Sequence, residues 1–238
     1  LYVQEDLIGQ IWKDRPPMSK EPVWILDEAY SGRSTKDKLA AVREKMKEKG
    51  AEVHLLASLY DIAWLLNVRG NDISYVPVVL SYLALTQEQC IWFLQEEVVD
   101  DTLREYLQKN GITTRPYEAF YEYVKTLENQ TILLNRAVVN TKICNNLPES
   151  AQMIDAEDPT LEMKAVKNET EISNTRKAHV KDAVAMCRFM YWLKKNVGKI
   201  PMTEISASEY LESLRREQEG LLDLSFDTRD SAPFTPKC

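Results

Sequence analysis

"STKDKLAAVREKMKEKGAEVHLLASLYDIAWLLN", residues 34–67, contains a helix, a strand and a second helix in direct succession. Ser34 predicts the N-cap of the first helix, and Gly50 predicts its end, because glycine readily adopts a left-handed conformation there. The apolar run at 52–57 then predicts a buried strand, and Ser58 predicts the cap of the helix that follows. A short apolar strand between two amphipathic helices is typical of an α/β fold.

The same alternation extends along the chain on both sides of this unit. Strands are expected at 23–26, 77–86, 89–95 and 131–135, the second and third forming a hairpin, and helices are expected at 98–111 and 117–127. Residues 136–144 fit either a strand or a short helix. The polar stretch 150–160 is expected to end the domain. The pattern predicts an α/β fold with a mixed sheet flanked by helices.

A second part of the chain begins at a strong helix start. Asn168 and Glu171 have the spacing of a capping box, which is worth about 1 kcal/mol. The helix that they begin is expected to reach residue 195. A second helix is expected in 203–220 and a strand at 221–226, whereas the last residues show no periodicity.

The first of these two helices carries several large apolar side chains at helical spacing. They are Met186, Phe189, Met190, Trp192 and Leu193. Side chains of this size each contribute roughly 1.5–3 kcal/mol when buried, so leaving them in water is costly. We expect this face to pack against the α/β domain or against a second copy of the chain.

Composition excludes several classes of protein. The net charge of −7 argues against a nucleic-acid partner, and no apolar run approaches the ~20 residues that span a bilayer. The first twelve residues have no basic segment, so no signal peptide is expected. Cys90, Cys144, Cys187 and Cys238 lie far apart, which favours buried, reduced thiols of a cytoplasmic protein over a zinc site.

Few residues qualify as candidates for catalysis. No two of the seven glycines lie close together, which excludes phosphate-binding glycine loops, and no GxSxG motif occurs. His54 lies in the expected strand 52–57, where a core or surface-strand role is favoured over catalysis. His179 and Asp182 lie three residues apart on one helix and could share a metal ion or a proton, but a partly buried structural histidine is favoured. No catalytic, cofactor-binding or metal-binding residue is predicted.

Several separated stretches of the chain resemble one family of peptidases. These stretches are IWKDRPP (11–17), DKLAAVREKM (37–46), LYDIAWLLNVRGNDI (59–73), PVVLSY (77–82), KAVKNETEI and KAHVKDAVAM (within 164–186), and TEISASEYLESLRREQEGLLDLSFDT (203–228). In order and spacing they resemble the Xaa-Pro aminopeptidases, or aminopeptidases P, in their three-domain form. That resemblance implies two related creatinase-type α/β domains and a catalytic "pita-bread" domain. The catalytic domain binds two divalent metals, usually manganese, and hydrolyses the bond before a penultimate proline.

The resemblance also implies a division of the chain. Residues 1–21 would be the end of the first domain and a linker, and 22–159 the second, non-catalytic domain. Residues 160–228 would be the start of the catalytic domain, two helices and a strand, and 229–238 a tail that does not match the family. The family's metal ligands and substrate-handling histidines would all lie after this point. The chain is therefore expected to be a non-catalytic fragment, inactive alone and without a cofactor.

The partners expected on this basis are other parts of the same protein. One is the remainder of the parent chain. The other is a second copy, either by self-association of the isolated chain or in a homodimer of the parent. Neither a nucleic acid nor a membrane is expected as a partner. An alternative is an independent α/β module that binds a peptide or a regulatory ligand. A third possibility is an independent enzyme that acts on a small molecule at a new site.

Overall fold

The centre of the fold is a six-stranded mixed sheet. A computed structural model describes residues 7–226. The sheet strands are β2 Val53–Leu56, β4 Tyr82–Thr86, β5 Cys90–Leu94, β6 Ile112–Pro116, β7 Thr131–Leu134 and β8 Gln152–Asp155. Their order across the sheet is β6-β5-β4-β2-β7-β8. Neighbours β2–β4 and β4–β5 are antiparallel, and the three other pairs are parallel. The expected mixed sheet and its hairpin are thus confirmed.

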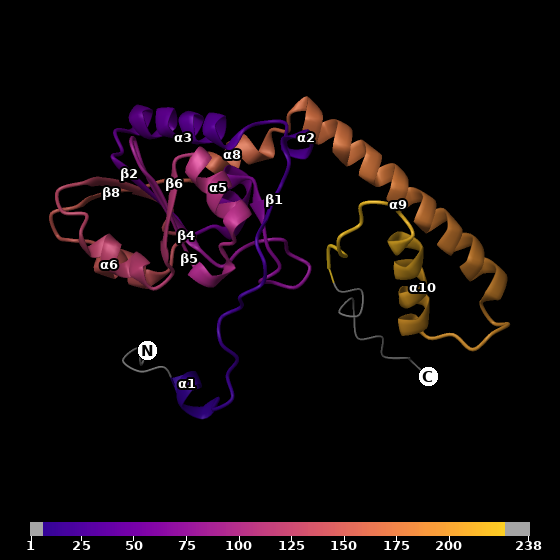
Figure 1. Cartoon of the computed structure of the whole chain (residues 1–238). Coiled ribbons are helices and arrows are strands. Elements are labelled where there is room, and N and C mark those ends of the chain that lie inside the picture. The colour runs from indigo at the N-terminus through magenta and orange to yellow at the C-terminus, as the bar shows by residue number, and fades with distance from the viewer. Residues whose placement is uncertain (1–6, 227–238) are drawn as a thin grey trace.

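Helices cover both faces of this sheet (Figure 1). On one side lie α3 Thr35–Lys49, α4 Leu59–Leu66 and α5 Asp101–Lys109, and on the other α6 Ala119–Lys125 and α7 Thr141–Asn146. Alternation along β4 shows why two cores form. Leu83 and Leu85 face the first set of helices, whereas Tyr82 and Ala84 face the second. Of residues 136–144, the later part forms α7, so the helical alternative is the correct one.

Smaller elements complete the α/β body. They are α1 Leu7–Ile11, α2 Glu28–Ser31, the one-turn helix η1 Glu96–Val98, and the two-stranded pair of β1 Trp24–Ile25 with β3 Val68–Arg69. The pairing of β3 with β1 brings Arg69 opposite Trp24 and close to the end of α4. The expected strand at 23–26 is confirmed, whereas no strand was expected at β3.

The helix caps predicted from the sequence are present. The Ser34 hydroxyl accepts from the backbone N–H of Asp37, and Gly50 closes the same helix with φ 70°. Ser58 caps α4 in the same way. These contacts satisfy backbone groups that a helix end otherwise leaves unpaired, each worth about 1 kcal/mol.

The polar stretch 150–160 contributes to the sheet. It forms the edge strand β8 and the start of α8 Pro159–Ala165. Both faces of β8 are largely exposed, so the strand lacks the apolar alternation by which strands are recognised. Helix α8 packs on α3 and α4, and Met163 joins their core. The domain boundary at 159 stays a prediction.

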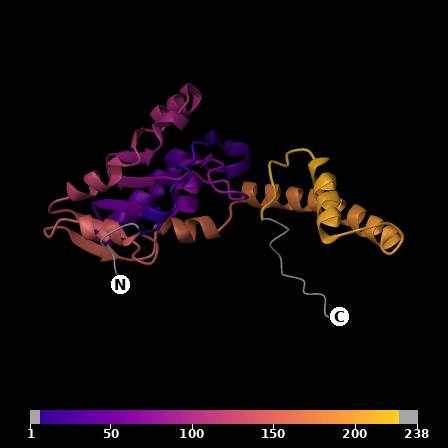
Figure 2. The same ribbon diagram turned by 90° about the horizontal axis from the view of Figure 1, so that it is seen from below.

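Two helices follow the α/β body. The long helix α9 Glu169–Asn196 begins with the expected capping box, contacts α2 near its start, and extends away from the sheet (Figures 1 and 2). Helix α10 Glu204–Arg216 folds back along α9. Trp192 and Tyr210 stack between them with ring centroids 4.1 Å apart. The expectation that this face packs on the α/β domain is therefore wrong, since α10 takes that place.

Residues 221–226 do not form the expected strand. A strand needs a neighbour for its backbone hydrogen bonds, and the described residues after α8 contain no other strand to pair with it. The tail 229–238 lies outside the described residues. Among residues 7–226, no helix combines the length and apolar content that crossing a bilayer requires.

Candidate functional site

Polar side chains gather inside the α/β body where β2, α4 and α8 meet. His54 comes from β2, Asp61 from α4, and Asp158 and Thr160 from the start of α8, and each is at most 5% exposed. Lys164, one turn further along α8, lies with Nζ 2.9 Å from Oδ1 of Asp61. Elements far apart in the sequence thus place five polar groups in one buried cluster.

The geometry of His54 fixes where its proton lies. Its Nδ1 is 3.1 Å from the carbonyl oxygen of Leu133, which can only accept a hydrogen bond. In the neutral ring Nδ1 therefore carries the proton, and Nε2 is a bare acceptor. Nε2 lies 3.7 Å from Oδ1 of Asp158, so two acceptors face each other unless a proton sits between them.

Burial shifts both pKa values in the direction that this geometry requires. Burial lowers the pKa of His54 to about 4. Burial, followed by repulsion from Asp61, raises the pKa of Asp158 to about 7, although Lys164 opposes the change. Between pH 4 and 7 the His54 ring is thus neutral, with its proton on Nδ1, and the Asp158 carboxyl is mostly protonated.

His54, Asp61, Asp158 and Thr160 are closed to solvent, so no substrate can reach His54 without opening the body, whereas the Lys164 side chain is partly exposed. The contacts of this cluster connect α8 to the sheet and to α4. Of the two roles expected for His54, the core role is the correct one. Sequence reasoning missed Asp158, Thr160 and Lys164, because they lie in a stretch that looks like a polar loop.

His179 and Asp182 do not form a buried pair. His179 is exposed, and the Asp182 carboxylate accepts a hydrogen bond from Nε of Arg215 on α10 at 2.7 Å. The expectation that His179 is partly buried is wrong, because α9 extends away from the body. The possible functional pair is thus not supported.

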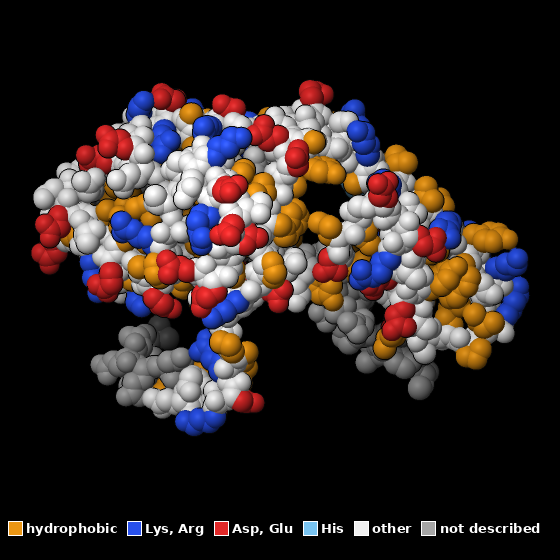
Figure 3. Space-filling model, viewed as in Figure 1, with side chains coloured by type: hydrophobic (Ala, Val, Ile, Leu, Met, Phe, Trp, Pro, Cys, Tyr) orange, Lys and Arg blue, Asp and Glu red, His pale blue; other side chains and the backbone are white. Residues whose placement is uncertain are grey.

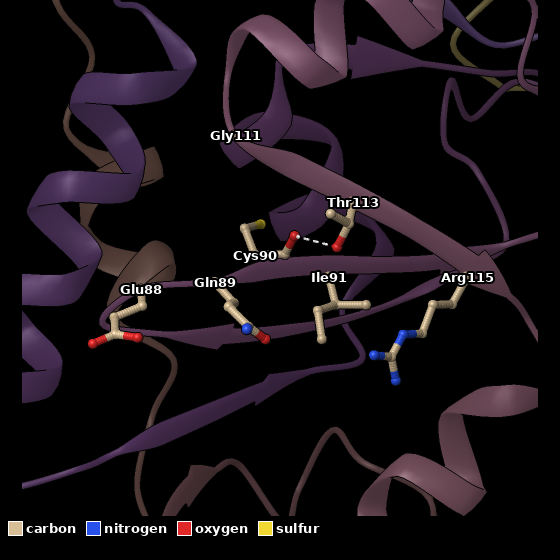
Figure 4. Close-up of a pocket in the computed structure, with 7 residues that line it drawn as sticks. All are labelled: Glu88, Gln89, Cys90, Ile91, Gly111, Thr113 and Arg115. Carbon is tan, nitrogen blue, oxygen red and sulfur yellow. Dashed lines mark hydrogen bonds between the residues drawn. The ribbon is translucent and has the colours of Figure 1, made fainter.

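A shallow pocket of about 370 Å³ lies at the β5–β6 edge of the sheet (Figure 4). Glu88, Cys90 and Arg115 are its residues with reactive or charged side chains. Cys90 is 1% exposed, and burial raises the pKa of its thiol to about 12, so it is not a nucleophile. Arg115 lies over the ring of Tyr123. Nothing in this pocket provides a base next to a nucleophile.

The other described cysteines vary in exposure. Cys144 is intermediate and Cys187 is exposed, so the expectation of buried thiols holds for Cys90 alone, whereas Cys238 lies outside the described residues. All three described cysteines are free thiols.

Within residues 7–226, no three His, Cys, Asp or Glu side chains are grouped so that they could hold a metal ion. The donor set of a two-metal centre therefore does not fit the described part of the chain. That the chain has no metal ligand remains a prediction from the sequence.

A comparison with family profiles matches residues 14–171 to the creatinase/prolidase N-terminal domain. Among curated proteins, the chain is 32% identical to a probable Xaa-Pro aminopeptidase P of Neurospora crassa and covers 35% of it. It is 36% identical to a probable Xaa-Pro aminopeptidase P of Laccaria bicolor and covers 36% of it. The matches include 96% and 95% of this chain.

The match to a solved structure also extends over nearly the whole chain. X-prolyl aminopeptidase from Caenorhabditis elegans, described as a cytosolic enzyme with a di-nuclear active site, superposes with a TM-score of 0.87 at 29% identity. The superposition covers 94% of this chain and 38% of that one. The chain thus spans between a third and two fifths of the length of these relatives.

Proposed function

The chain belongs to the creatinase/prolidase N-terminal domain family, and on that premise we propose that it forms the non-catalytic part of a metal-dependent Xaa-Pro aminopeptidase. The observation that carries the proposal is the extent of the C. elegans match. At 94% of this chain it reaches beyond the family profile, which ends at residue 171, into α9 and α10. An isolated domain of the family has no reason to keep those two helices.

That match supports the following proposed division of the chain into domains. In this division, residues 1–21 are the end of the first domain and a linker, and 22–159 are the non-catalytic second domain. The catalytic domain begins with 160–228, and 229–238 remain unassigned. The whole protein would release the N-terminal residue from peptides with proline in second position, in the cytoplasm. Two divalent metals, manganese by preference, would be held by ligands outside this chain.

The proposed partner is the remainder of the same protein. Large apolar side chains remain exposed on α9 and α10 after the two helices have packed together (Figure 3). On α9 they include Val180 at 65%, Val184 at 46% and Tyr191 at 68% exposure. A surface of this kind favours packing against further protein.

A chimera tests the proposal directly. The segment of the C. elegans enzyme that matches this chain is replaced by residues 7–226, and cleavage of an Xaa-Pro peptide is measured with manganese. We expect an active chimera, whereas the C. elegans enzyme lacking the segment should be inactive. This chain alone, with the same peptide and metal, should release no product. An inactive but folded chimera, or a metal-dependent activity of the chain alone, would contradict the proposal.

The alternative of a ligand-binding module has one observation in its favour. A second pocket, lined by several charged side chains, lies between the α/β body and the start of α9. An independent enzyme finds no comparable support in the described residues.

A further inference from the structure

The pocket at the start of α9 is small and polar. It has a volume of about 220 Å³, and its lining includes Lys38 of α3, Trp64 of α4, Arg69 of β3, and Lys167 and Glu171 at the start of α9. A water molecule occupies ~30 Å³ of the liquid, and ligand pockets for drug-sized molecules start near ~300 Å³. The pocket is therefore the size for a small ion and a few waters.

Lys38 is the most deeply buried charge in the pocket. It is 1% exposed, and its ammonium donates to the carbonyl of Trp64 at 2.8 Å and to Oδ1 of Asn67 at 2.7 Å. The same group lies 4.4 Å from the centre of the Trp64 ring. All three partners are formally neutral. Burial lowers the pKa of Lys38 to about 8, and Glu171 is the carboxylate that most opposes this change.

Arg69 adds a second, largely buried cation. Its Nη1 donates to the carbonyl oxygens of Ala63 and Val68 at 2.9 and 2.8 Å, which fixes the guanidinium in place. Among the described residues its other two nitrogens have no hydrogen-bond partner, so they remain free to donate. Burial lowers the pKa of Arg69 as well, and Glu171 opposes the change.

The charges around this pocket do not balance. Lys38, Arg69 and Lys167 line it, against the single carboxylate of Glu171. That carboxylate already accepts from the backbone N–H of Asn168 in the capping box. The N-terminus of the 28-residue helix α9 adds a partial positive charge at the same place. Buried cations without a counter-charge are costly, and an anion would relieve that cost.

We propose that this pocket binds a small oxyanion, a carboxylate or a phosphate group, held between the Lys38 ammonium and the Arg69 guanidinium. Guanidinium nitrogens match the geometry of both groups, and the exposed Lys167, whose ammonium donates to the carbonyl of Lys164, adds a third cation at the mouth. The bound anion joins β3 and α3 of the body to the first turn of α9. Binding therefore stabilises the junction between the α/β body and α9.

Thermal unfolding of the whole chain at pH 7 tests this inference, since Lys38 is then mostly protonated. The probes are sodium phosphate and sodium acetate, each compared with sodium chloride at equal ionic strength. With the probe in tenfold excess over its Kd, Tm should rise by about 4 °C relative to chloride. The two probes distinguish phosphate from carboxylate as the preferred group, and a rise with either supports the pocket.

Variants test whether the rise in Tm comes from binding in this pocket. In Arg69→Gln the rise should be lost, and in Lys167→Gln, an exposed position, it should fall by about half. Lys36→Gln, an exposed lysine on α3 outside the pocket, serves as the matched control and should respond like the unchanged chain. If Arg69→Gln does not fold, calorimetric titration with phosphate is used to compare Lys167→Gln with Lys36→Gln. A weaker Kd in Lys167→Gln supports the proposal, and equal Kd values overturn it. It is equally overturned if neither probe exceeds chloride, or if all variants respond alike. This readout is independent of peptidase activity, so it can fail or succeed separately from the proposed function.

Discussion

His54 and Asp158 lie next to each other inside the α/β body, and burial shifts both pKa values, so their contributions to stability depend on pH. The pKa of Asp158 rises from 3.8 to about 7 on folding, so its contribution is present below pH 4 and is lost as pH rises through 7. The pKa of His54 falls from 6.5 to about 4, so its contribution is present above pH 6.5 and is lost as pH falls through 4. Between pH 4 and 6.5 the two effects oppose each other.

Asp158→Asn should separate these two effects. Asparagine keeps the shape, can donate to Nε2 of His54 and cannot ionise, so only the contribution of His54 remains. From pH 5 to pH 8 the free energy of unfolding of this variant should rise relative to the unchanged chain by on the order of 2 kcal/mol. Urea unfolding at both pH values measures the difference.

Glu157→Gln is the matched control for that measurement, because Glu157 is the exposed carboxyl next to Asp158. It should change stability by less than about 0.5 kcal/mol at either pH. A constant difference between Asp158→Asn and the unchanged chain across the pH range would show that folding does not raise the pKa of Asp158. Asp61 and Lys164 face the pair and are unchanged in both variants.

The sequence predicted the environment of some buried polar residues only in part and missed that of others. It assigned His54 to a strand with Val53 and Leu55 but left a core and a surface-strand role open, and the fold decides for the core. It could not find the partners of His54, since Asp61 reads as a cap residue and Asp158 as part of a polar loop. Lys38 was missed for a similar reason: it lies in a helix rich in exposed lysines, and only the tertiary fold buries it. Contacts between distant elements leave no local signal.

At the scale of elements, Gly32 permits the close approach of α2 and α9. A Cβ at Gly32 would lie 2.4 Å from Oδ1 of Asn168 and 2.6 Å from Cβ of Thr170. Gly32→Ala should therefore lower the free energy of unfolding by about 2 kcal/mol more than Gly50→Ala does. Chemical unfolding of both variants provides the measurement.

Gly50 is the appropriate control because it also closes a helix, with φ 70° against 65° for Gly32, and has no atom near its Cβ position. Both variants thus carry the same backbone strain of about 1–2 kcal/mol, and only one carries the clash. Equal losses in the two would mean that α9 does not pack against α2 in solution.

Helices α9 and α10 should depend on their aromatic contact. Trp192→Ala removes the stacking on Tyr210, and we expect it to cost about 2 kcal/mol and to expose the connection at 197–203 to proteases. Tyr191→Ala is its matched control, since Tyr191 is 68% exposed and should be nearly neutral. The contact is unimportant if limited proteolysis cuts both variants at the same rate.

Elements were predictable where local chemistry decides them. The caps at Ser34, Ser58 and Asn168 each have a side chain that bonds within its own first turn, so the sequence is enough to locate them. β8 and residues 221–226 show the opposite case. β8 forms because β7 pairs with it, whereas 221–226 are irregular because none of the strands found in 7–226 lies beside them.

For the molecule as a whole, the exposed apolar side chains of α9 predict self-association of the isolated chain. Val180→Glu combined with Val184→Glu should shift the chain towards monomer at high concentration, because burying those carboxylates is costly. Static light scattering over a concentration series measures the change. Val138→Glu, at a position 45% exposed on the α/β body, should leave association unchanged. A chain that is monomeric at every concentration would refute the prediction.

Within residues 7–226, helix α9 contacts the α/β body mainly through α2 near its N-terminus, and 28 residues make it about 42 Å long. Such a rod acts as a lever whose pivot is the turn around Asn168. A tilt of ~10° at the pivot displaces the far end by about 7 Å, far more than the movement at the pivot itself. A small change in the tilt of α9 at its first turn therefore becomes a large displacement of its C-terminal end and of α10, which packs there.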